Sequence, residues 1–250
     1  MSNETLNPIQ NDESHVISII IPTWNEAKSI GLLLQYLTEN IAEKELIEIL
    51  VVDCESEDQT REEVNKFMRF YDHCSTQLLI SEKGRAKQMN YGAQHASGSV
   101  LYFLHADSYP PNHFDTLIRN EIKQNNKAGC FIMRFDSNHW WLKLAGWLTR
   151  FKSKACRGGD QSLFITKTLF NELGGYDKKY TVFEDQDFIS KLYNKKEFTI
   201  IKNWLTTSAR RYRSNGIWKL QYHFWAIYIK KFLGASADEL YRYYLKNIRN

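Results

Sequence analysis

Several features that define common classes of protein are scarce in this chain. The 250 residues include only four cysteines, and no two of them form a C-x-x-C pair. This spacing argues against a disulfide scaffold and against structural zinc, and it favours a reducing, cytoplasmic environment. No stretch reaches the roughly 18 uninterrupted apolar residues of a membrane span. Residues 1–14 are polar, lack the apolar segment of a signal peptide and are expected to form a mobile leader.

Three common motifs of nucleotide-binding and hydrolytic enzymes are also missing. There is no G-x-G-x-x-G after the first expected strand, no G-x-x-x-x-G-K-[ST], and no G-x-S-x-G. Their absence excludes a dinucleotide fingerprint and a P-loop, and it weakens a hydrolase interpretation. The net charge of +4 suits an anionic ligand such as a nucleoside diphosphate. Because the basic residues do not gather into one patch, no nucleic-acid partner is expected.

The first half of the chain does contain a regular alternation of strands and helices. Predominantly apolar runs indicate strands at 16–21, 47–52, 78–81 and 100–104, and the first of them is rich in β-branched residues. Helical segments separate them, with Asn25 as the expected cap of the first helix. This alternation predicts an α/β fold with a mostly parallel central sheet flanked by helices.

Polar clusters stand at the carboxyl ends of three of these strands, at 23–26, 53–60 and 105–107. Parallel sheets bind ligands in the crevice beyond those ends. The coincidence of the clusters with the strand ends therefore predicts a binding site there.

The second half of the chain is less regular. Its pattern predicts strands at 128–135, 162–166, 198–201 and 206–212, with helices at 140–151 and 184–193. From Ile217 the chain is expected to be helical to its end, with a break at 234–236. The expected organisation is one domain over 15–215 and a helical extension over 216–250, packed on that domain or at an interface.

Five blocks, in order along the chain, resemble the family 2 glycosyltransferases. They read I-S-I-I-I-P-T-W-N-E-A, V-V-D-C-E-S-E-D-Q-T, G-R-A-K-Q-M-N-Y-G-A-Q-H-A-S-G, F-L-H-A-D-S and G-G-Y-D-K-K-Y-T-V-F-E-D-Q-D-F. The resemblance implies a Rossmann-like GT-A fold and inverting transfer of a sugar from a nucleotide-diphosphate sugar to a hydroxyl acceptor. The residues of the third and fourth blocks, together with T-S-A-R-R-Y, resemble the sequences of a bacterial subgroup. That subgroup is described as radical-SAM/selenodomain-associated or arsenosugar-biosynthesis glycosyltransferases.

The resemblance also implies which side chains bind the donor. Asp53 would accept a hydrogen bond from the nucleobase, although a polar strand end or a cap is the alternative interpretation. Thr23 and Asn25 would line the base and ribose pocket unless they are only caps, and Arg85 would contact the diphosphate. The remaining residues expected on the donor side are Pro22, Glu26, Gln88, Asn90, Ala106 and Asp107.

A divalent cation, Mn²⁺ or Mg²⁺, is expected beside the diphosphate, because it offsets the charge of that leaving group. Asp107 is the expected metal ligand. His105 replaces the first Asp of the family's D-x-D pattern, and it is either a second ligand, a ribose contact or an ordinary strand-end residue.

The catalytic and acceptor residues follow from the last blocks. Asp185 would be the general base, with Glu184 beside it at the start of a helix. Gly159, Asp160 and Gln161 are expected on the acceptor side. Processive relatives carry Q-x-x-R-W where this chain has A-R-R-Y-R, which favours transfer of a single sugar. One of Arg210, Arg211 and Arg213 is a candidate for the diphosphate, and the sequence does not choose among them.

Two aromatic, basic helical stretches, at 140–151 and 217–232, allow two interpretations. Core packing or a homodimer interface is preferred over contact with a membrane surface. The protein is accordingly expected in the cytoplasm, and at the inner face of the membrane if these helices contact a membrane surface. The expected acceptor is a small molecule or a lipid-linked molecule.

Two other functions remain alternatives. A sugar nucleotidyltransferase would form a nucleotide sugar, but it usually needs a Gly-rich basic loop after the first strand. A catalytically weak nucleotide-binding or membrane-associated scaffold is favoured only by the substitution at His105.

Overall fold

A computed structural model describes residues 15–71, 74–158 and 161–248 of the chain. The leader expected at 1–14 lies outside the described residues. The strands are β1 Ile17–Thr23, β2 Ile47–Asp53, β3 Ser75–Ile80, β4 Val100–Phe103, β5 Ser108–Tyr109, β6 Ala128–Phe135, β7 Leu163–Thr166 and β8 Thr199–Thr207. The α-helices are α1 Ala27–Asn40, α2 Thr60–Phe70, α3 Arg85–His95, α4 Phe114–Lys123, α5 Trp140–Leu148, α6 Lys167–Glu172, α7 Glu184–Asn194, α8 Arg210–Asn215, α9 Ile217–Phe232 and α10 Ala237–Asn247.

All strands belong to one sheet, in the order β3-β2-β1-β4-β7-β6-β8-β5. The four strands predicted in the first half form its parallel part, with β1 between β2 and β4. The second half is mixed, because β7 is antiparallel to both β4 and β6, whereas β6 and β8 are parallel. The antiparallel strand β7 thus joins the first half of the sheet to the second.

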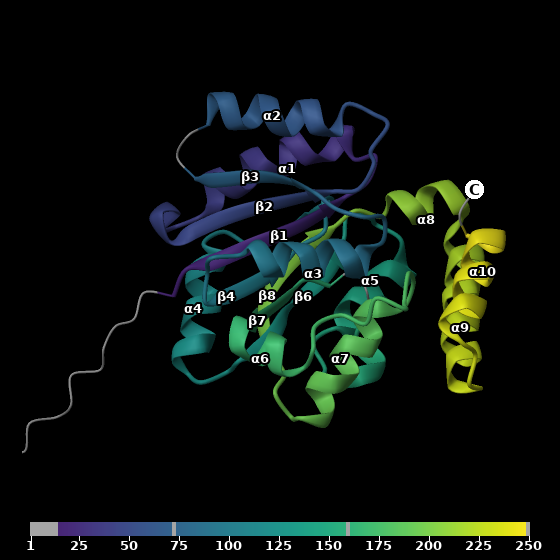
Figure 1. The fold of residues 1–250 in the computed structure, drawn as a ribbon. Helices are drawn as coiled ribbons and strands as arrows, with labels where there is room; N and C mark the ends of the chain where they lie inside the picture. Colours follow the sequence, from purple (N-terminus) through teal and green to yellow (C-terminus); the bar gives the residue numbers. More distant parts are fainter. Residues whose placement is uncertain (1–14, 72–73, 159–160, 249–250) are drawn as a thin grey trace, which may run out of the picture.

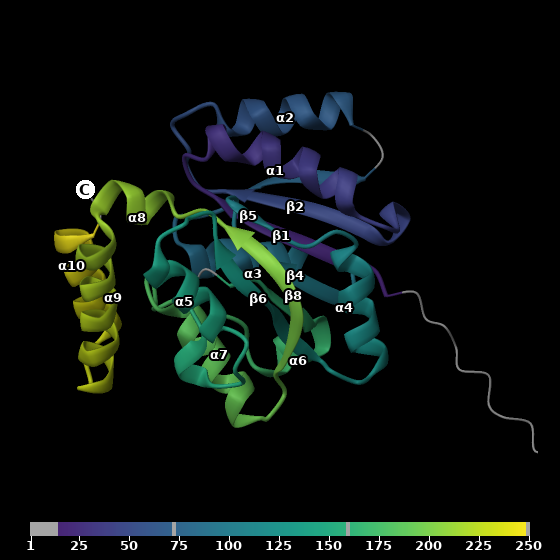
Figure 2. The ribbon, with the colours of Figure 1, turned by 180° about the vertical axis from the view of Figure 1, so that it is seen from behind.

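Helices cover both faces of the sheet because the central strands are apolar on both sides. On one face, Ile19 and Ile21 pack in a cluster with residues of α1, α2 and α4. On the other face, Ile20 and Leu50 pack with residues of α3, α6 and α7. Figures 1 and 2 show these layers, with α1 and α2 on the opposite side of β1 and β2 from α3.

One expected strand is wrong. The sequence T-S-A-R-R-Y predicted strand structure over 206–212, but β8 ends at Thr207 and α8 begins at Arg210. The Asp136 carboxylate accepts a hydrogen bond from the backbone N–H of Ala209, and the hydroxyl of Ser208 accepts one from that of Arg210. These side-chain oxygens accept hydrogen bonds from backbone N–H groups that, in a longer strand, would need acceptors on a neighbouring strand.

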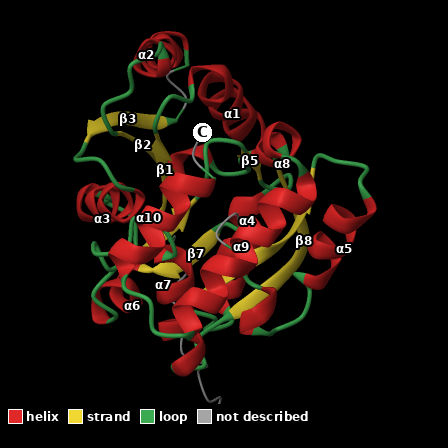
Figure 3. Cartoon of the chain, turned by 90° about the vertical axis from the view of Figure 1, so that its right-hand side faces the viewer, coloured by secondary structure: helices red, strands yellow, loops and turns green. Residues whose placement is uncertain are grey.

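The C-terminal helices α9 and α10 pack against each other and stand beside the domain, as Figure 3 shows. Their buried residues Leu220, Ile227 and Leu240 form a third cluster together with Leu142 of α5 and Tyr212 of α8. In Figure 1, β1 runs from the N-terminal trace towards the side on which α8, α9 and α10 stand, so these helices lie near the carboxyl ends of the parallel strands. In the described part of the chain, no helix combines the length and the hydropathy of a membrane span.

Candidate active site

The loops that follow β1 and β2 are joined by hydrogen bonds at the carboxyl edge of the sheet. The backbone N–H groups of Glu26 and Ala27, at the start of α1, donate to Thr60 Oγ1 at 2.8 Å and Asp58 Oδ2 at 3.1 Å. These bonds satisfy donors that a helix N-terminus leaves unpaired. The loop after β2 therefore fixes the position of the loop after β1.

The expected role of Asn25 as a helix cap is wrong. Glu26 is the N-cap residue of α1, and no side chain caps that helix locally. Asn25 instead adopts a left-handed backbone, with φ of 54°, and its Oδ1 accepts a hydrogen bond at 2.9 Å from the N–H of Glu57. The side chain of Asn25 thus bonds the neighbouring loop because that loop already supplies the acceptors for α1.

Asp53, at the end of β2, is fully buried. Its Oδ2 lies 2.7 Å from Nε of Arg61, and its Oδ1 accepts a hydrogen bond from the Ser56 hydroxyl. In this geometry Asp53 is a polar strand end, the alternative interpretation, and its bonds order the turn after β2. The expected hydrogen bond from a nucleobase to Asp53 stays a prediction. Arg61 was not singled out from the sequence.

Gln88 connects the ends of two parallel strands. Its Nε2 donates to the carbonyl oxygens of Thr23 at 2.8 Å and Val52 at 2.7 Å. Both Gln88 and Thr23 are buried. These two residues were expected on the donor side, and in the structure they are buried and hold the ends of the two strands together.

Asn90 of α3 holds the Gly-Gly-Tyr turn that leads towards α7. Its Nδ2 donates to the carbonyl of Tyr176 at 2.8 Å, and its Oδ1 accepts from the N–H of Tyr176 at 3.0 Å. Gly175 in this turn has φ of 67°, and a Cβ there would lie 2.7 Å from Asn90 Oδ1. Asn90 thus acts on the site through Tyr176, whereas its expected direct contact with the donor stays a prediction.

Arg210 connects two of the expected donor-side carboxylates. Its guanidinium forms a two-point ion pair with Glu26, at 2.7 and 3.1 Å, and Nη2 lies 3.9 Å from Asp107 Oδ2. Arg213 instead pairs with Asp136, and Arg211 bonds the hydroxyl of Tyr244. Of the three candidate arginines, the structure therefore brings Arg210 to the segment 105–107, where the metal ligands are expected and in which Ala106 is buried.

Glu184 and Asp185 occupy the first turn of α7, where the helix dipole favours carboxylates. Nη1 of Arg85, the first residue of α3, lies 3.4 Å from Glu184 Oε1 and 3.5 Å from Asp185 Oδ2. Burial raises the pKa of the Glu184 carboxyl, and the Arg85 guanidinium opposes that shift. Arg85, expected at the diphosphate, thus balances the charge of the expected catalytic pair in this structure.

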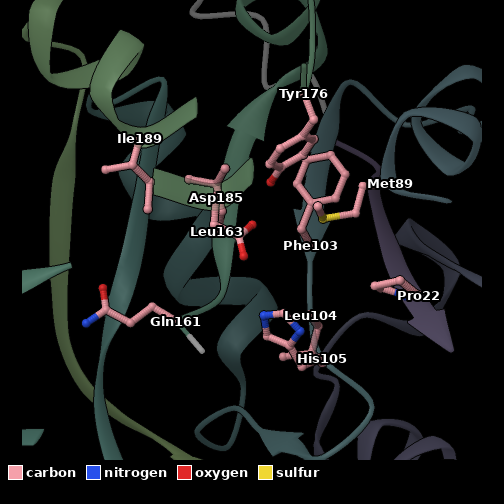
Figure 4. A pocket seen from close by; sticks show the side chains of 10 residues that line it. All are labelled: Pro22, Met89, Phe103, Leu104, His105, Gln161, Leu163, Tyr176, Asp185 and Ile189. Atoms are coloured by element: carbon pink, nitrogen blue, oxygen red, sulfur yellow. The ribbon is translucent and has the colours of Figure 1, made fainter. Parts of the chain in front are cut away.

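A cavity joins residues from the separate blocks, and Figure 4 shows its walls. Asp185 reaches it from α7, and Pro22 and His105 reach it from the ends of β1 and β4. Gln161, expected on the acceptor side, completes the polar part of the lining. The apolar part consists of Met89, Phe103, Leu104, Leu163, Tyr176 and Ile189. Residues expected on the donor side, in catalysis and on the acceptor side therefore line one cavity.

Gln161 is held by a buried arginine that the sequence did not single out. Nη1 of Arg157 donates to Gln161 Oε1 at 3.2 Å, and Nη2 donates to the Phe151 carbonyl at 2.7 Å. Gln186 of α7 donates in turn to the carbonyl of Arg157. The other two acceptor-side candidates, Gly159 and Asp160, lie outside the described residues.

The described residues offer few ligands for a metal ion. Within 15–71, 74–158 and 161–248, no three His, Cys, Asp or Glu side chains are grouped so that they could hold one. Asp107, whose side chain is 26% exposed, can supply one carboxylate oxygen, and His105 stands two residues before it. A divalent ion fits here only if the diphosphate provides further oxygen ligands, as hard cations prefer.

The sequence matches the family model described as Glycosyl transferase family 2 over residues 18–198. The PGL/p-HBAD biosynthesis glycosyltransferase of Mycobacterium bovis is 30% identical over 182 residues, which cover 69% of this chain and 68% of that protein. Glycosyltransferase AglE of Haloferax volcanii is 35% identical over 94 residues, 38% of this chain and 31% of AglE. This chain thus spans less than a third of AglE.

Solved structures show the same fold. The mannosyltransferase PcManGT of Pyrobaculum calidifontis, in complex with GDP-Man and Mn²⁺, gives a TM-score of 0.64 at 20% identity over 94% of this chain and 65% of that one. This structural similarity confirms the expected GT-A fold. At this sequence identity it is evidence about the fold and not about the substrate. The family model matches most of the chain. This match and the similarity to the M. bovis protein together show that this chain belongs to glycosyl transferase family 2.

Proposed function

We propose that this chain transfers a single sugar from a nucleotide-diphosphate sugar to a hydroxyl acceptor, with inversion at the anomeric carbon. The observation that carries the proposal is the shared cavity, which is lined by Asp185 together with Pro22 and His105 from the strand ends. The bound nucleotide sugar of PcManGT supports the donor class. The bacterial arsenosugar-type subgroup and the small-molecule or lipid-linked nature of the acceptor stay predictions.

Asp185 is the proposed general base. Its carboxylate takes the proton of the acceptor hydroxyl while the hydroxyl oxygen forms a bond to the anomeric carbon. The bond between that carbon and the diphosphate oxygen breaks, and the nucleoside diphosphate leaves with the electron pair. Nη1 of Arg85, 3.5 Å from Asp185 Oδ2, places a positive charge beside the proposed base.

Arg210 is the proposed diphosphate contact among the three arginines. In the structure its charge is shared between Glu26 and Asp107. A diphosphate accepts strong, charge-assisted hydrogen bonds from a guanidinium. Mn²⁺ or Mg²⁺, when bound, would be held by Asp107, with His105 as a second candidate, and would offset charge on the leaving diphosphate.

The test compares two substitutions in the same helix, Asp185→Asn and Asp187→Asn. Asp187 pairs with Lys191 one turn further along α7, so its substitution controls for general effects on the helix. Purified protein is incubated with UDP- and GDP-sugars and Mn²⁺, and release of nucleoside diphosphate is measured together with nucleotide binding. We expect Asp185→Asn to lose about 10²- to 10⁴-fold in rate with unchanged nucleotide affinity, and Asp187→Asn to retain the rate.

Three outcomes would contradict the proposal. Equal loss of rate in both variants would argue against a base role for Asp185. Release of pyrophosphate from a nucleoside triphosphate would instead support a nucleotidyltransferase. Nucleotide binding without any release from a donor would support a scaffold.

A further inference from the structure

The aromatic residues of α9 form an exposed stripe instead of a core. Trp218, Tyr222, Trp225, Ile229 and Phe232 recur every three or four residues, so they share one face of the helix. All five are exposed, and Phe232 is exposed to 90%. Core packing, one of the two interpretations preferred from the sequence, is therefore wrong for this face of α9, whereas the homodimer interface stays a prediction.

The stripe continues onto α5. The ring centroid of Trp218 lies 5.8 Å from that of Trp140 and 5.6 Å from that of Trp141, and Trp141 Nε1 donates to Gln221 Oε1 at 3.1 Å. Trp140 is itself exposed to 60%. We call the exposed residues Trp140, Trp218, Tyr222, Trp225, Ile229 and Phe232 the aromatic face.

The two segments that carry the aromatic face bear charge of one sign. No Asp or Glu occurs in the sequence between Ser208 and Ala237, or between Ser137 and Gly158, the segments of α9 and α5. Lys143 of α5 and Lys219 and Lys230 of α9 are exposed. In a symmetric homodimer through this face, both copies would present the same patch, so these lysines would meet lysines without acidic partners on α5 or α9.

We infer that the aromatic face is a docking surface for an anionic lipid bilayer. Amphipathic helices with tryptophan on one face and lysines at its border lie in the headgroup region, where indole rings are favoured and basic side chains meet acidic lipids. α9 has 16 residues, fewer than the about 20 needed to span a bilayer, so it lies on the surface.

Residues of α9 beside the aromatic face connect this surface to the proposed catalytic helix α7. The Tyr228 ring lies 5.5 Å from that of Phe183, and Lys231 Nζ donates to the Tyr180 hydroxyl at 2.6 Å. Phe183 immediately precedes Glu184 and Asp185. Docking through α9 therefore holds the start of α7 close to the bilayer. This consequence rests on the proposed function, and it favours an acceptor displayed at the membrane surface.

The test measures co-flotation of the full chain with vesicles and needs neither donor nor acceptor, so it is independent of the proposed activity. Vesicles are made of phosphatidylcholine alone or mixed with phosphatidylglycerol. The variant Ile229→Ser with Phe232→Ser is compared with Leu32→Ser combined with Phe70→Ser, two exposed apolar residues on α1 and α2. Because all four side chains are exposed, we expect both variants to fold, and circular dichroism checks this.

We expect the wild type to float with the anionic vesicles, less so at high salt, and poorly with the neutral ones. The α9 variant should bind about tenfold more weakly or worse, since two inserted apolar side chains are lost, and the α1–α2 variant should bind as the wild type does. A second pair, Lys143→Gln with Lys219→Gln, should weaken binding to anionic vesicles, whereas Lys28→Gln with Lys66→Gln should not.

The proposal is overturned if the wild type fails to float with anionic vesicles at low salt, or if both variants of the apolar pairs lose binding equally. Equal binding to neutral vesicles would overturn the choice of an anionic surface. A wild-type dimer that the α9 variant dissociates, without any vesicle binding, would identify a second copy of the chain as the occupant.

Discussion

The clearest quantitative prediction concerns Asn90, which the sequence suggested as a donor contact and the structure bonds to Tyr176. Both hydrogen bonds, at 2.8 and 3.0 Å, join buried groups. Asn90→Ala removes both and leaves the backbone N–H and C=O of Tyr176 buried without these partners. Each such group costs about 1–3 kcal/mol, so we expect the free energy of unfolding to fall by about 2–6 kcal/mol.

The assay is guanidinium denaturation, followed in parallel by calorimetric titration with UDP and GDP. Asn65→Ala, an exposed position in the helix α2, is the matched control and should change the free energy of unfolding by less than about 0.5 kcal/mol. Nucleotide affinity of folded Asn90→Ala should change little. A loss of stability below about 1 kcal/mol, together with a fall of about tenfold or more in affinity, would refute the reasoning and restore Asn90 as a nucleotide contact.

Two further predictions test the site and its support. Arg210→Gln should weaken UDP or GDP binding by about tenfold in calorimetry with Mn²⁺, because a half-exposed, charge-assisted contact is lost. Arg213→Gln breaks the contacts with Asp136 and Ser208 and should leave the affinity unchanged. Equal effects of the two substitutions would contradict the choice of Arg210. Gly92→Ala should lower the free energy of unfolding by about 1–3 kcal/mol in denaturant titration, because a Cβ there would lie 2.6 Å from Ile20 Cγ2. Gly31→Ala is the control for Gly92→Ala, because a Cβ at Gly31 would contact only the end of the Glu63 side chain, at 3.3 Å. Unchanged stability of Gly92→Ala would contradict the close packing of α3 on the sheet.

The parallel half of the fold could be predicted from the sequence because its signals are local. The run from Ile47 to Val52 is apolar except for Glu48 and ends at Asp53, and β2 has the same bounds to within one residue. The helix starting near Glu184 was likewise predictable, since acidic residues gather in its first turn. Such features depend on neighbours in the chain and not on distant contacts.

The errors come from contacts between segments that are distant in the sequence. Asn25 does not cap α1 because Thr60 and Asp58, more than 30 residues away, provide the acceptors. The strand expected through Tyr212 ends at Thr207, where Asp136 bonds the N–H of Ala209. Nor does helical periodicity reveal whether the stripe through Trp218 faces a core or solvent, since both give the same spacing.

The central claim is that the sugar nucleotide binds where the strand ends meet the start of α7. A crystal structure of the protein with UDP or GDP and Mn²⁺ tests it directly. We expect the diphosphate beside Asp107 and Arg210, an anomalous manganese signal at Asp107, and the Asp185 carboxylate facing the open end of the diphosphate. A nucleotide bound elsewhere, or bound with Asp185 on the far side of the molecule, would contradict the account.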